Sequence, residues 1–427
     1  MTGHIHDFIG IGLGPFNLGL ACLTEPIDLD GLFLEARDEI TWHPGMLLDD
    51  ATLQVPFLAD LVTMADPTST YSYLAFLKGT GRLYPFYIRE SFYPLRREYS
   101  DYCRWAADRL SNVRFGCPVS TVEHDGEAYV VTTNSERHRA RRLVLGVGTR
   151  PVVPDALAGV DGAQALHSAD YLGHRDTLLT LDSITVVGSG QSAAEVYADL
   201  LSAAPDHRYA LNWVTRSPRF FPMEYTKLTL EMTSPEYAAY FRSLPSDTRT
   251  RLNRAQRSLH KGISAKLVDR IYDLQYELRA TGRSPELTMV TGTEVVGARR
   301  DGSSYQLDLH HLDTDESFGL RTEGLVMATG YAPRVPDFLD PVRHRIAWDE
   351  QGRYEVSATY ATDRTGDEIF VQNADEHVHG LIAPDLGMGA YRNSVIIAAM
   401  TGREVYPLEK RIATQHFGVP DHLKAAR

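Results

Sequence analysis

The stretch Gly10-Ile-Gly12-Leu-Gly14-Pro15 decides the fold, because it follows an apolar run (His6-Asp-Phe-Ile) and precedes a helical pattern. Glycines at this spacing let the backbone approach a pyrophosphate at a helix N-terminus, where free N–H groups and the helix dipole favour anions. Pro15 replaces the third glycine of this fingerprint, and proline is tolerated in the first turn of a helix. The next apolar run ends in Glu35, where a ribose-binding carboxylate is expected.

A turn of the same kind, Gly188-Ser-Gly190-Gln191-Ser192-Ala193, follows a second apolar run, Ile184-Thr-Val-Val. The next strand ends at Arg216, a base at the place where an NAD-preferring site carries an acid. A cation there pairs with a 2′-phosphate and favours NADPH over NADH, although a solvated charge at the strand end is the alternative interpretation. Two such turns predict an α/β chain with two Rossmann-like dinucleotide-binding domains, one for FAD and one for NADPH, and a small substrate-binding region.

Prolines and small-residue turns divide the chain. The runs that end at Gly146-Val-Gly148 and at Thr329-Gly330 have the same form, an apolar strand followed by a small turn and two prolines. We expect residues 1–170 and 330–427 to form the FAD-binding domain. The NADPH-binding domain is expected as an insertion at 171–329, with a helical substrate-binding region at 220–282 and strand pairs over 287–312.

Composition and charge narrow the class of protein. The net charge of −13 argues against nucleic acid and anionic membranes as partners. Cys22, Cys103 and Cys117 form no Cys-x-x-Cys pair, which argues against a disulfide reductase and a cysteine-rich zinc site, and no metal site is expected. Sparse cysteines suit a reducing cytoplasm, and the sequence lacks both a long apolar run and a basic-then-apolar leader. We therefore expect a cytoplasmic protein.

Further motifs occur along the chain: Trp42-His-Pro-Gly-Met, Leu53-Gln54, Asp60-Leu61, Phe220-Phe-Pro-Met-Glu-Tyr, Ala328-Thr-Gly-Tyr and His379-Gly-Leu. Together with Pro15-Phe-Asn after the first glycines, they resemble the flavin-dependent N-hydroxylating monooxygenases of siderophore biosynthesis. This family includes lysine, ornithine and diamine N-hydroxylases. The resemblance covers nearly the whole chain, and the amino-acid sequence is especially similar to those of cadaverine and putrescine N-hydroxylases.

The resemblance implies which residues hold the cofactors. The FAD pyrophosphate would lie at Gly10, Gly12, Gly14 and Pro15, and its ribose at Glu35. Trp42, His43 and Gln54 would lie near the isoalloxazine ring, with Gln54 also assigned to catalysis. Core packing for Trp42 and a structural hydrogen bond for His43 are the alternatives. The other cofactor contacts are expected at Gly188, Gly190, Gln191, Ser192, Arg216, Thr329 and Gly330.

The implied reaction is N-hydroxylation of a primary amine, with O₂ as co-substrate. NADPH reduces FAD, reduced flavin and O₂ form a C4a-hydroperoxyflavin, and the amine attacks its distal oxygen. The amine must be neutral, and deprotonating an alkylamine at neutral pH costs about 4 kcal/mol. Desolvation supplies part of that cost, so an apolar or amide-lined pocket is expected at the reacting end.

The residue before Asp60-Leu61 bears on the choice of amine. In amino-acid N-hydroxylases of this family a lysine stands there and pairs with the substrate carboxylate, whereas this chain has Ala59. A carboxylate would lose a charge-assisted hydrogen bond worth about 1.5–3 kcal/mol. We therefore predict a linear diamine, cadaverine or putrescine, with its distal ammonium near Asp60, Glu224 or Glu231.

Three alternatives remain open, one of which is a non-catalytic NADPH-binding module. An L-lysine N6-monooxygenase or L-ornithine N5-monooxygenase would hold the substrate carboxylate with Lys227 or Lys261. An uncoupled NADPH oxidase flavoprotein would turn the consumed NADPH into H₂O₂. Members of the family form dimers or tetramers, so the resemblance also implies a homo-oligomer.

Overall fold

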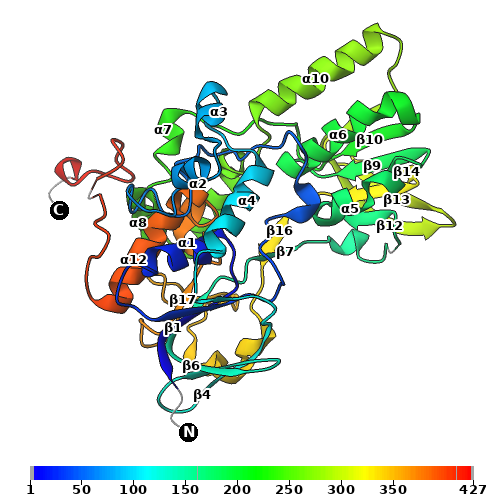
Figure 1. The fold of residues 1–427 in the computed structure, drawn as a ribbon. Helices are drawn as coiled ribbons and strands as arrows, with labels where there is room; N and C mark the ends of the chain where they lie inside the picture. The colour runs from blue at the N-terminus through cyan, green and yellow to red at the C-terminus, as the bar shows by residue number, and fades with distance from the viewer. Residues whose placement is uncertain (1–3, 161, 410, 425–427) are drawn as a thin grey trace.

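The computed structural model describes residues 4–160, 162–409 and 411–424, and two open sheets dominate it (Figure 1). β17 (Ile369–Val371) joins the first sheet beside β6 (Arg137–Leu145), and β4 (Val119–His124) and β5 (Tyr129–Thr133) form its antiparallel edge, while its other strands run parallel. The remaining strands lie in the order β3 (Val113–Arg114), β2 (Gly31–Leu34), β1 (Ile5–Ile11), β6 (Arg137–Leu145), β5 (Tyr129–Thr133) and β4 (Val119–His124).

Helices cover one face of this sheet, and their apolar side chains are buried against the apolar side chains of its strands. Every residue of α1 (Pro15–Thr24) from Asn17 onward is buried, since the helix lies against both α4 (Arg96–Ala107) and α12 (Gly389–Thr401). The segment between β2 and α4 contributes α2 (Tyr73–Gly79) and α3 (Leu83–Ile88), whose aromatic rings extend the same core. The first turn therefore rests on a tightly packed layer.

The second sheet is parallel, and its strand order is typical of a doubly wound fold. It runs β11 (Leu287–Val290), β10 (Ala210–Val214), β9 (Ser183–Val187), β15 (Gly324–Met327) and β8 (Ala165–His167). Its helices are α5 (Tyr171–Leu178), α6 (Gln191–His207) and α10 (Ala265–Ala280), and β12 (Thr293–Asp301), β13 (Ser304–His311) and β14 (Glu316–Thr322) form a separate antiparallel sheet. The region predicted to be helical contains α7 (Lys227–Leu230), α8 (Pro235–Ser243) and α9 (Ser246–Ala255).

The chain passes between the two units through β7 (Thr149–Pro151) and β16 (Tyr331–Pro333), which pair with each other. In Figure 1 this pair lies between the first sheet and the second. The predicted boundary at residue 170 is wrong, because β8 pairs with β15 inside the second sheet. The predicted strand pairs over 287–312 also need correction, since β11 joins the parallel sheet and only β12 and β13 form the hairpin.

The predicted fold class is confirmed, since both Rossmann-like units are present. No helix within the described ranges is long and apolar enough to cross a membrane.

Candidate active site

The first turn begins at the carboxyl end of β1 and is shaped by the absence of side chains. Gly12 has φ of +86°, and a Cβ there would lie 2.5 Å from the carbonyl oxygen of Gly146. Gly14, by contrast, has open space where a Cβ would stand, and Pro15 occupies the first turn of α1. Asn17 donates its side-chain N–H to the Gly12 carbonyl at 2.8 Å, which fixes the turn from below.

Glu35 stands beside this turn at the end of β2, as predicted, and is 6% exposed. Its Oε2 accepts the backbone N–H of Leu13 at 2.7 Å, and its Oε1 accepts that of Arg37 at 3.0 Å. The carboxylate thus organises the turn itself, and Glu35 also lines a cavity beside the turn.

The second turn has the same construction at the carboxyl end of β9. Gly188 has φ of +149°, and a Cβ there would lie 2.3 Å from the carbonyl oxygen of Ala328. Gly190 caps α6, and Gln191 follows with both ends of its amide engaged. Its Oε1 accepts the Ser264 N–H at 2.8 Å, and its Nε2 donates to Glu195 at 2.9 Å.

One large cavity of about 2130 Å³ joins the two turns. Single-ligand pockets rarely exceed about 1,000 Å³, so this space suits two large ligands. It is lined by most of the predicted cofactor contacts, namely Gly12, Gly14, Pro15, Glu35, Trp42, His43, Gly188, Gly190, Gln191, Ser192, Arg216, Thr329 and Gly330. Glycine turns that leave backbone open at two helix N-termini fit two pyrophosphates.

Two predicted cofactor residues do not line the large cavity. Gly10 is buried beneath the turn, where a Cβ would meet the Phe33 ring at 2.4 Å. Gln54 instead lines a neighbouring small cavity of about 340 Å³. Its Nε2 is buried and has no hydrogen-bond partner among the described residues, so it is a donor available to a ligand.

Arg216 lies at the rim of the large cavity. Its side chain is 68% exposed, and its guanidinium lies 3.8 Å from Glu294 in a long, solvent-exposed ion pair. Further cations that line the same cavity include Arg219, Arg254, Arg257 and Lys261. This concentration of positive charge suits a phosphorylated ligand.

Trp42 and His43 are among the residues that line both cavities, and so they lie where the two cavities meet. The His43 ring makes edge contacts with Trp42 and with Tyr331, at centroid distances of 4.9 and 5.7 Å. Surrounding protein atoms, together with the charges of Arg96 and Arg37, lower the pKa of His43 to about 4. Its imidazole is therefore neutral at physiological pH and adds no charge between the cavities.

The small cavity has mainly apolar walls from the predicted helical region and from the loop after α11 (Glu376–His379). Asp385 lies in that loop and was not predicted from the sequence. Its Oδ1 accepts the Gly387 N–H at 2.7 Å, and no partner for Oδ2 occurs among the described residues. Burial raises the pKa of this carboxyl group, which indicates that a cation beside it would stabilise its ionised form.

The cations that line the small cavity are already paired. Arg96 on α4 makes a two-pronged ion pair with Glu195 on α6, with its closest N–O distance 2.8 Å, and both groups are nearly buried. Lys261 lies 3.8 Å from Glu376. The unpaired charge on this cavity's wall is therefore negative, from Asp385 and from Glu224, which only accepts the Ser258 hydroxyl.

Of the five predicted substrate residues, only Glu224 lines either cavity, and Ala59, Asp60, Lys227 and Glu231 line neither. Asp60 is buried and accepts the backbone N–H groups of Val62, Thr63 and Tyr73, so it holds a turn and the start of α2. Glu231 accepts hydrogen bonds from the segment 414–415, and Lys227 is exposed at the first position of α7.

Ala59 is the fourth of these residues. It is buried outside both cavities, with its Cβ 3.7 Å from the place that a Cβ of Gly387 would take. It therefore lies behind the loop that carries Asp385. A sequence signal for Asp385 was present in retrospect, since it is the one acid in the apolar stretch Leu381-Ile-Ala-Pro-Asp-Leu.

Comparison with known proteins agrees with this geometry. The family described as L-lysine 6-monooxygenase/L-ornithine 5-monooxygenase matches residues 4–333. The putrescine N-hydroxylase of Shewanella oneidensis is 48% identical over 97% of this chain and 84% of its own length. The FAD-bound crystal structure of the cadaverine monooxygenase of the desferrioxamine pathway from Erwinia amylovora has a TM-score of 0.95 and 48% identity, over 98% of this chain and 99% of its own. The structure of the ornithine N-hydroxylase of Kutzneria sp. 744, with reduced FAD, NADP⁺ and L-ornithine, has a TM-score of 0.85 and 30% identity. The match covers 93% of this chain and 99% of that chain.

Proposed function

This chain belongs to the L-lysine 6-monooxygenase/L-ornithine 5-monooxygenase family, and from that premise we propose that it N-hydroxylates one amine of a linear diamine, cadaverine or putrescine, for hydroxamate siderophore biosynthesis. It is an FAD- and NADPH-dependent monooxygenase. In the overall reaction the amine, O₂, NADPH and a proton give the hydroxylamine, NADP⁺ and water. The bound flavin and nicotinamide supply the reducing equivalents and the activation of oxygen.

The observation that carries the diamine assignment is the charge of the small cavity. Asp385 and Glu224 offer carboxylates without a paired cation, whereas Arg96 and Lys261 are both engaged. A distal ammonium gains a charge-assisted hydrogen bond there, and the carboxylate of lysine or ornithine meets repulsion. Two relatives named for putrescine and cadaverine support the same class.

The other walls of the small cavity serve the reacting amine. Leu53, Val55 and Met223 surround it with apolar surface, which disfavours an ammonium and so favours the neutral amine that the reaction needs. We propose that the buried Nε2 of Gln54 donates a hydrogen bond at the reacting end. Neutral His43 and Trp42, at the boundary between the two cavities, limit the entry of water.

A substrate panel tests the proposal. Cadaverine, putrescine, L-lysine and L-ornithine are compared by hydroxylamine formed per NADPH oxidised, with H₂O₂ measured in parallel. A diamine should give the highest coupled turnover. Highest coupling with lysine or ornithine would contradict the diamine assignment and point to Lys261 as the carboxylate partner. Quantitative H₂O₂ with every amine would identify an oxidase.

The role of Asp385 is tested by Asp385→Asn, which keeps the shape of the side chain and removes its charge. We expect KM for the diamine to rise about tenfold or more, because an ion-paired hydrogen bond is worth about 1.5–3 kcal/mol. NADPH oxidation without amine should not change. Asp176→Asn, at a fully exposed position on α5, is the matched control. An unchanged KM in Asp385→Asn would transfer the role to Glu224.

We also propose that the protein is a cytoplasmic homo-oligomer. On and after α3, four large apolar side chains are 52–74% exposed, more than a monomer usually leaves together: Tyr84, Tyr87, Ile88 and Phe92. Three unpaired cysteines suit a reducing compartment. Light scattering on the purified protein and fractionation of the producing cell test the two statements, and a monomer or an exported protein would contradict them.

A further inference from the structure

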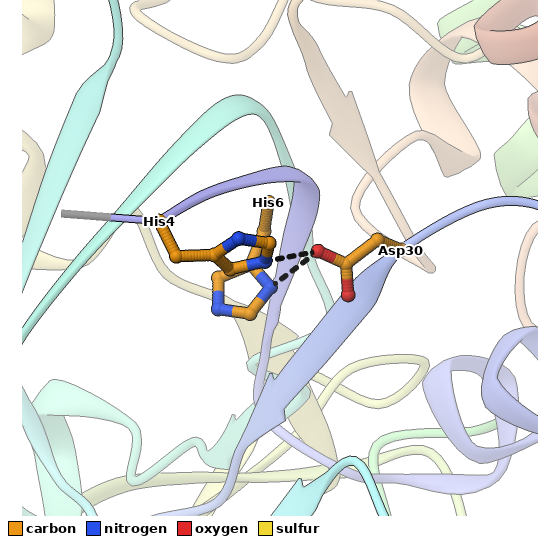
Figure 2. A group of neighbouring side chains, drawn as sticks. All are labelled: His4, His6 and Asp30. Atoms are coloured by element: carbon orange, nitrogen blue, oxygen red, sulfur yellow. Dashed lines mark hydrogen bonds and ion pairs between the residues drawn. The ribbon is translucent and has the colours of Figure 1, made fainter. Parts of the chain in front are cut away.

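Three metal-ligating side chains meet at the amino end of the first sheet, far from both turns. His4 directly precedes β1 and His6 lies within it, so their side chains point to the same face of the strand. Asp30 directly precedes β2, the neighbouring strand. Figure 2 shows both imidazole rings directed at one carboxylate oxygen of Asp30. His4 Nε2 lies 2.6 Å and His6 Nδ1 2.9 Å from that oxygen.

The backbone holds Asp30 in place for this meeting. The Asp30 N–H donates to the Asp7 carboxylate at 3.0 Å, and the Asp7 N–H donates to the Asp30 carbonyl at 2.9 Å. The His6 side chain is only 20% exposed, which limits its freedom, while His4 and Asp30 remain 70% and 46% exposed. Two of the three ligands are thus positioned by strand structure, and solvent has access to the third.

We propose that His4, His6 and Asp30 bind one divalent transition-metal ion, of the zinc class, with water completing the coordination. Two imidazole nitrogens and one carboxylate oxygen are a donor set that Zn²⁺ favours. Their three donor atoms lie within 4.8 Å of one another. Donors at about 2.0–2.1 Å from a tetrahedral ion stand roughly 3.3 Å apart, so the hydrogen-bonded atoms, now 2.6 and 2.9 Å apart, would separate by roughly 0.4–0.7 Å.

A metal ion bound at this site would stabilise the fold and would take no part in the N-hydroxylation reaction. It lies at the opposite end of β1 from the first turn, about 20 Å away at the rise of an extended strand. A bound ion would tie the start of the chain to β2. No metal site was expected from the sequence, which has no Cys-x-x-Cys pair, and Asp30 becomes a neighbour of His4 and His6 only through the pairing of β1 with β2.

The experiment uses the full-length, FAD-loaded protein without a polyhistidine tag, treated with EDTA and then freed of chelator. Titration with ZnCl₂ in a calorimeter should show one saturable site, and zinc should raise the melting temperature. His4→Ala should weaken binding by about tenfold or more, and Asp30→Asn likewise. Because His4 is exposed, its removal poses little risk to folding.

His310→Ala is the matched control, since His310 is a partly exposed histidine 3.3 Å from Asp315 and outside the proposed site. It should leave the zinc isotherm unchanged. An anomalous difference peak at the zinc edge between His4, His6 and Asp30 would place the ion directly. Absence of a saturable site, or an isotherm that His4→Ala does not alter, would overturn the proposal. Because the readout is metal binding, its result is independent of the substrate panel.

Discussion

Gly12 shows how strongly a single position can control cofactor binding. A side chain there meets the Gly146 carbonyl and must also adopt φ of +86°. We predict that Gly12→Ala purifies with less than about a tenth of the wild-type FAD content, because the turn must open to relieve the contact. Flavin absorbance per protein measures this.

Gly81→Ala is the control for Gly12→Ala. Gly81 also has a positive φ, +74°, but it has no neighbour within 4 Å of a Cβ and lines neither cavity. It should lose about 1–2 kcal/mol of stability at most and keep its FAD. Equal FAD content in the two variants would contradict the role assigned to the turn.

His43 predicts a pH dependence of stability. The unfolded chain protonates this histidine near pH 6.5, whereas the folded chain resists protonation until about pH 4. The stability due to neutral His43 is therefore complete above pH 6.5 and is lost as pH falls toward 4. His43 faces a cavity, so we expect less than about 1 kcal/mol of this loss by pH 5.

Urea unfolding at pH 7.5 and pH 5 checks this dependence. His43→Asn should lose less stability on acidification than the wild-type protein does, because its side chain cannot take up the proton. An equal loss in both proteins would show that the ring is not held neutral.

At the scale of elements, one ion pair joins α4 of the first unit to α6 of the second. The Arg96 and Glu195 side chains are only 12% and 6% exposed, and Glu195 also accepts from Gln191 at the second turn. We predict that Glu195→Gln costs about 3 kcal/mol of unfolding free energy, since it leaves the Arg96 charge buried without its counter-charge. KM for NADPH should rise as well, because Gln191 is released.

A surface pair provides the comparison for this prediction. Arg299 and Asp308 bridge the β12–β13 hairpin with side chains 63% and 50% exposed. Asp308→Asn should cost less than about 1 kcal/mol and leave KM for NADPH unchanged. Chemical denaturation and steady-state kinetics measure both effects. If Glu195→Gln were as mild as Asp308→Asn, the pair would not couple the two units.

What the sequence predicted well is local. Both strand–turn–helix segments are encoded by a few consecutive residues, so β1 with α1 and β9 with α6 lie where expected. β8 was placed in the wrong unit because a strand of three residues carries no sequence signal that shows which sheet it joins. Asp60 was taken for a substrate contact because it belongs to a motif, although its partners are backbone groups nearby.

Long-range contacts could not be predicted, because only local structure is encoded by a few consecutive residues. Arg96 and Glu195 meet only once both units are folded, and the exposure of Asp385 to the small cavity depends on a loop near the end of the chain. Neither relation leaves a spacing that can be read along the sequence.

At the scale of the whole molecule, the large cavity is bounded by both units. A ligand that fills it contributes its binding free energy to folding, about 2.7 kcal/mol when its concentration is a hundred times Kd. We predict that removing FAD lowers the melting temperature and that adding it back restores the original value. Differential scanning calorimetry with and without FAD measures this. A melting temperature independent of FAD would contradict the assignment of the cavity.

The pairing of β7 with β16 has a consequence for how this chain can be rebuilt. Pro151 stands opposite Tyr331 in an antiparallel register, so the two ends of everything between them are already neighbours. A two-residue turn linking these positions would convert the pair into an ordinary hairpin. The chain thus leaves the first unit and returns to it at neighbouring positions, so the two junctions of a graft that replaces residues 152–330 with those of a relative would lie side by side.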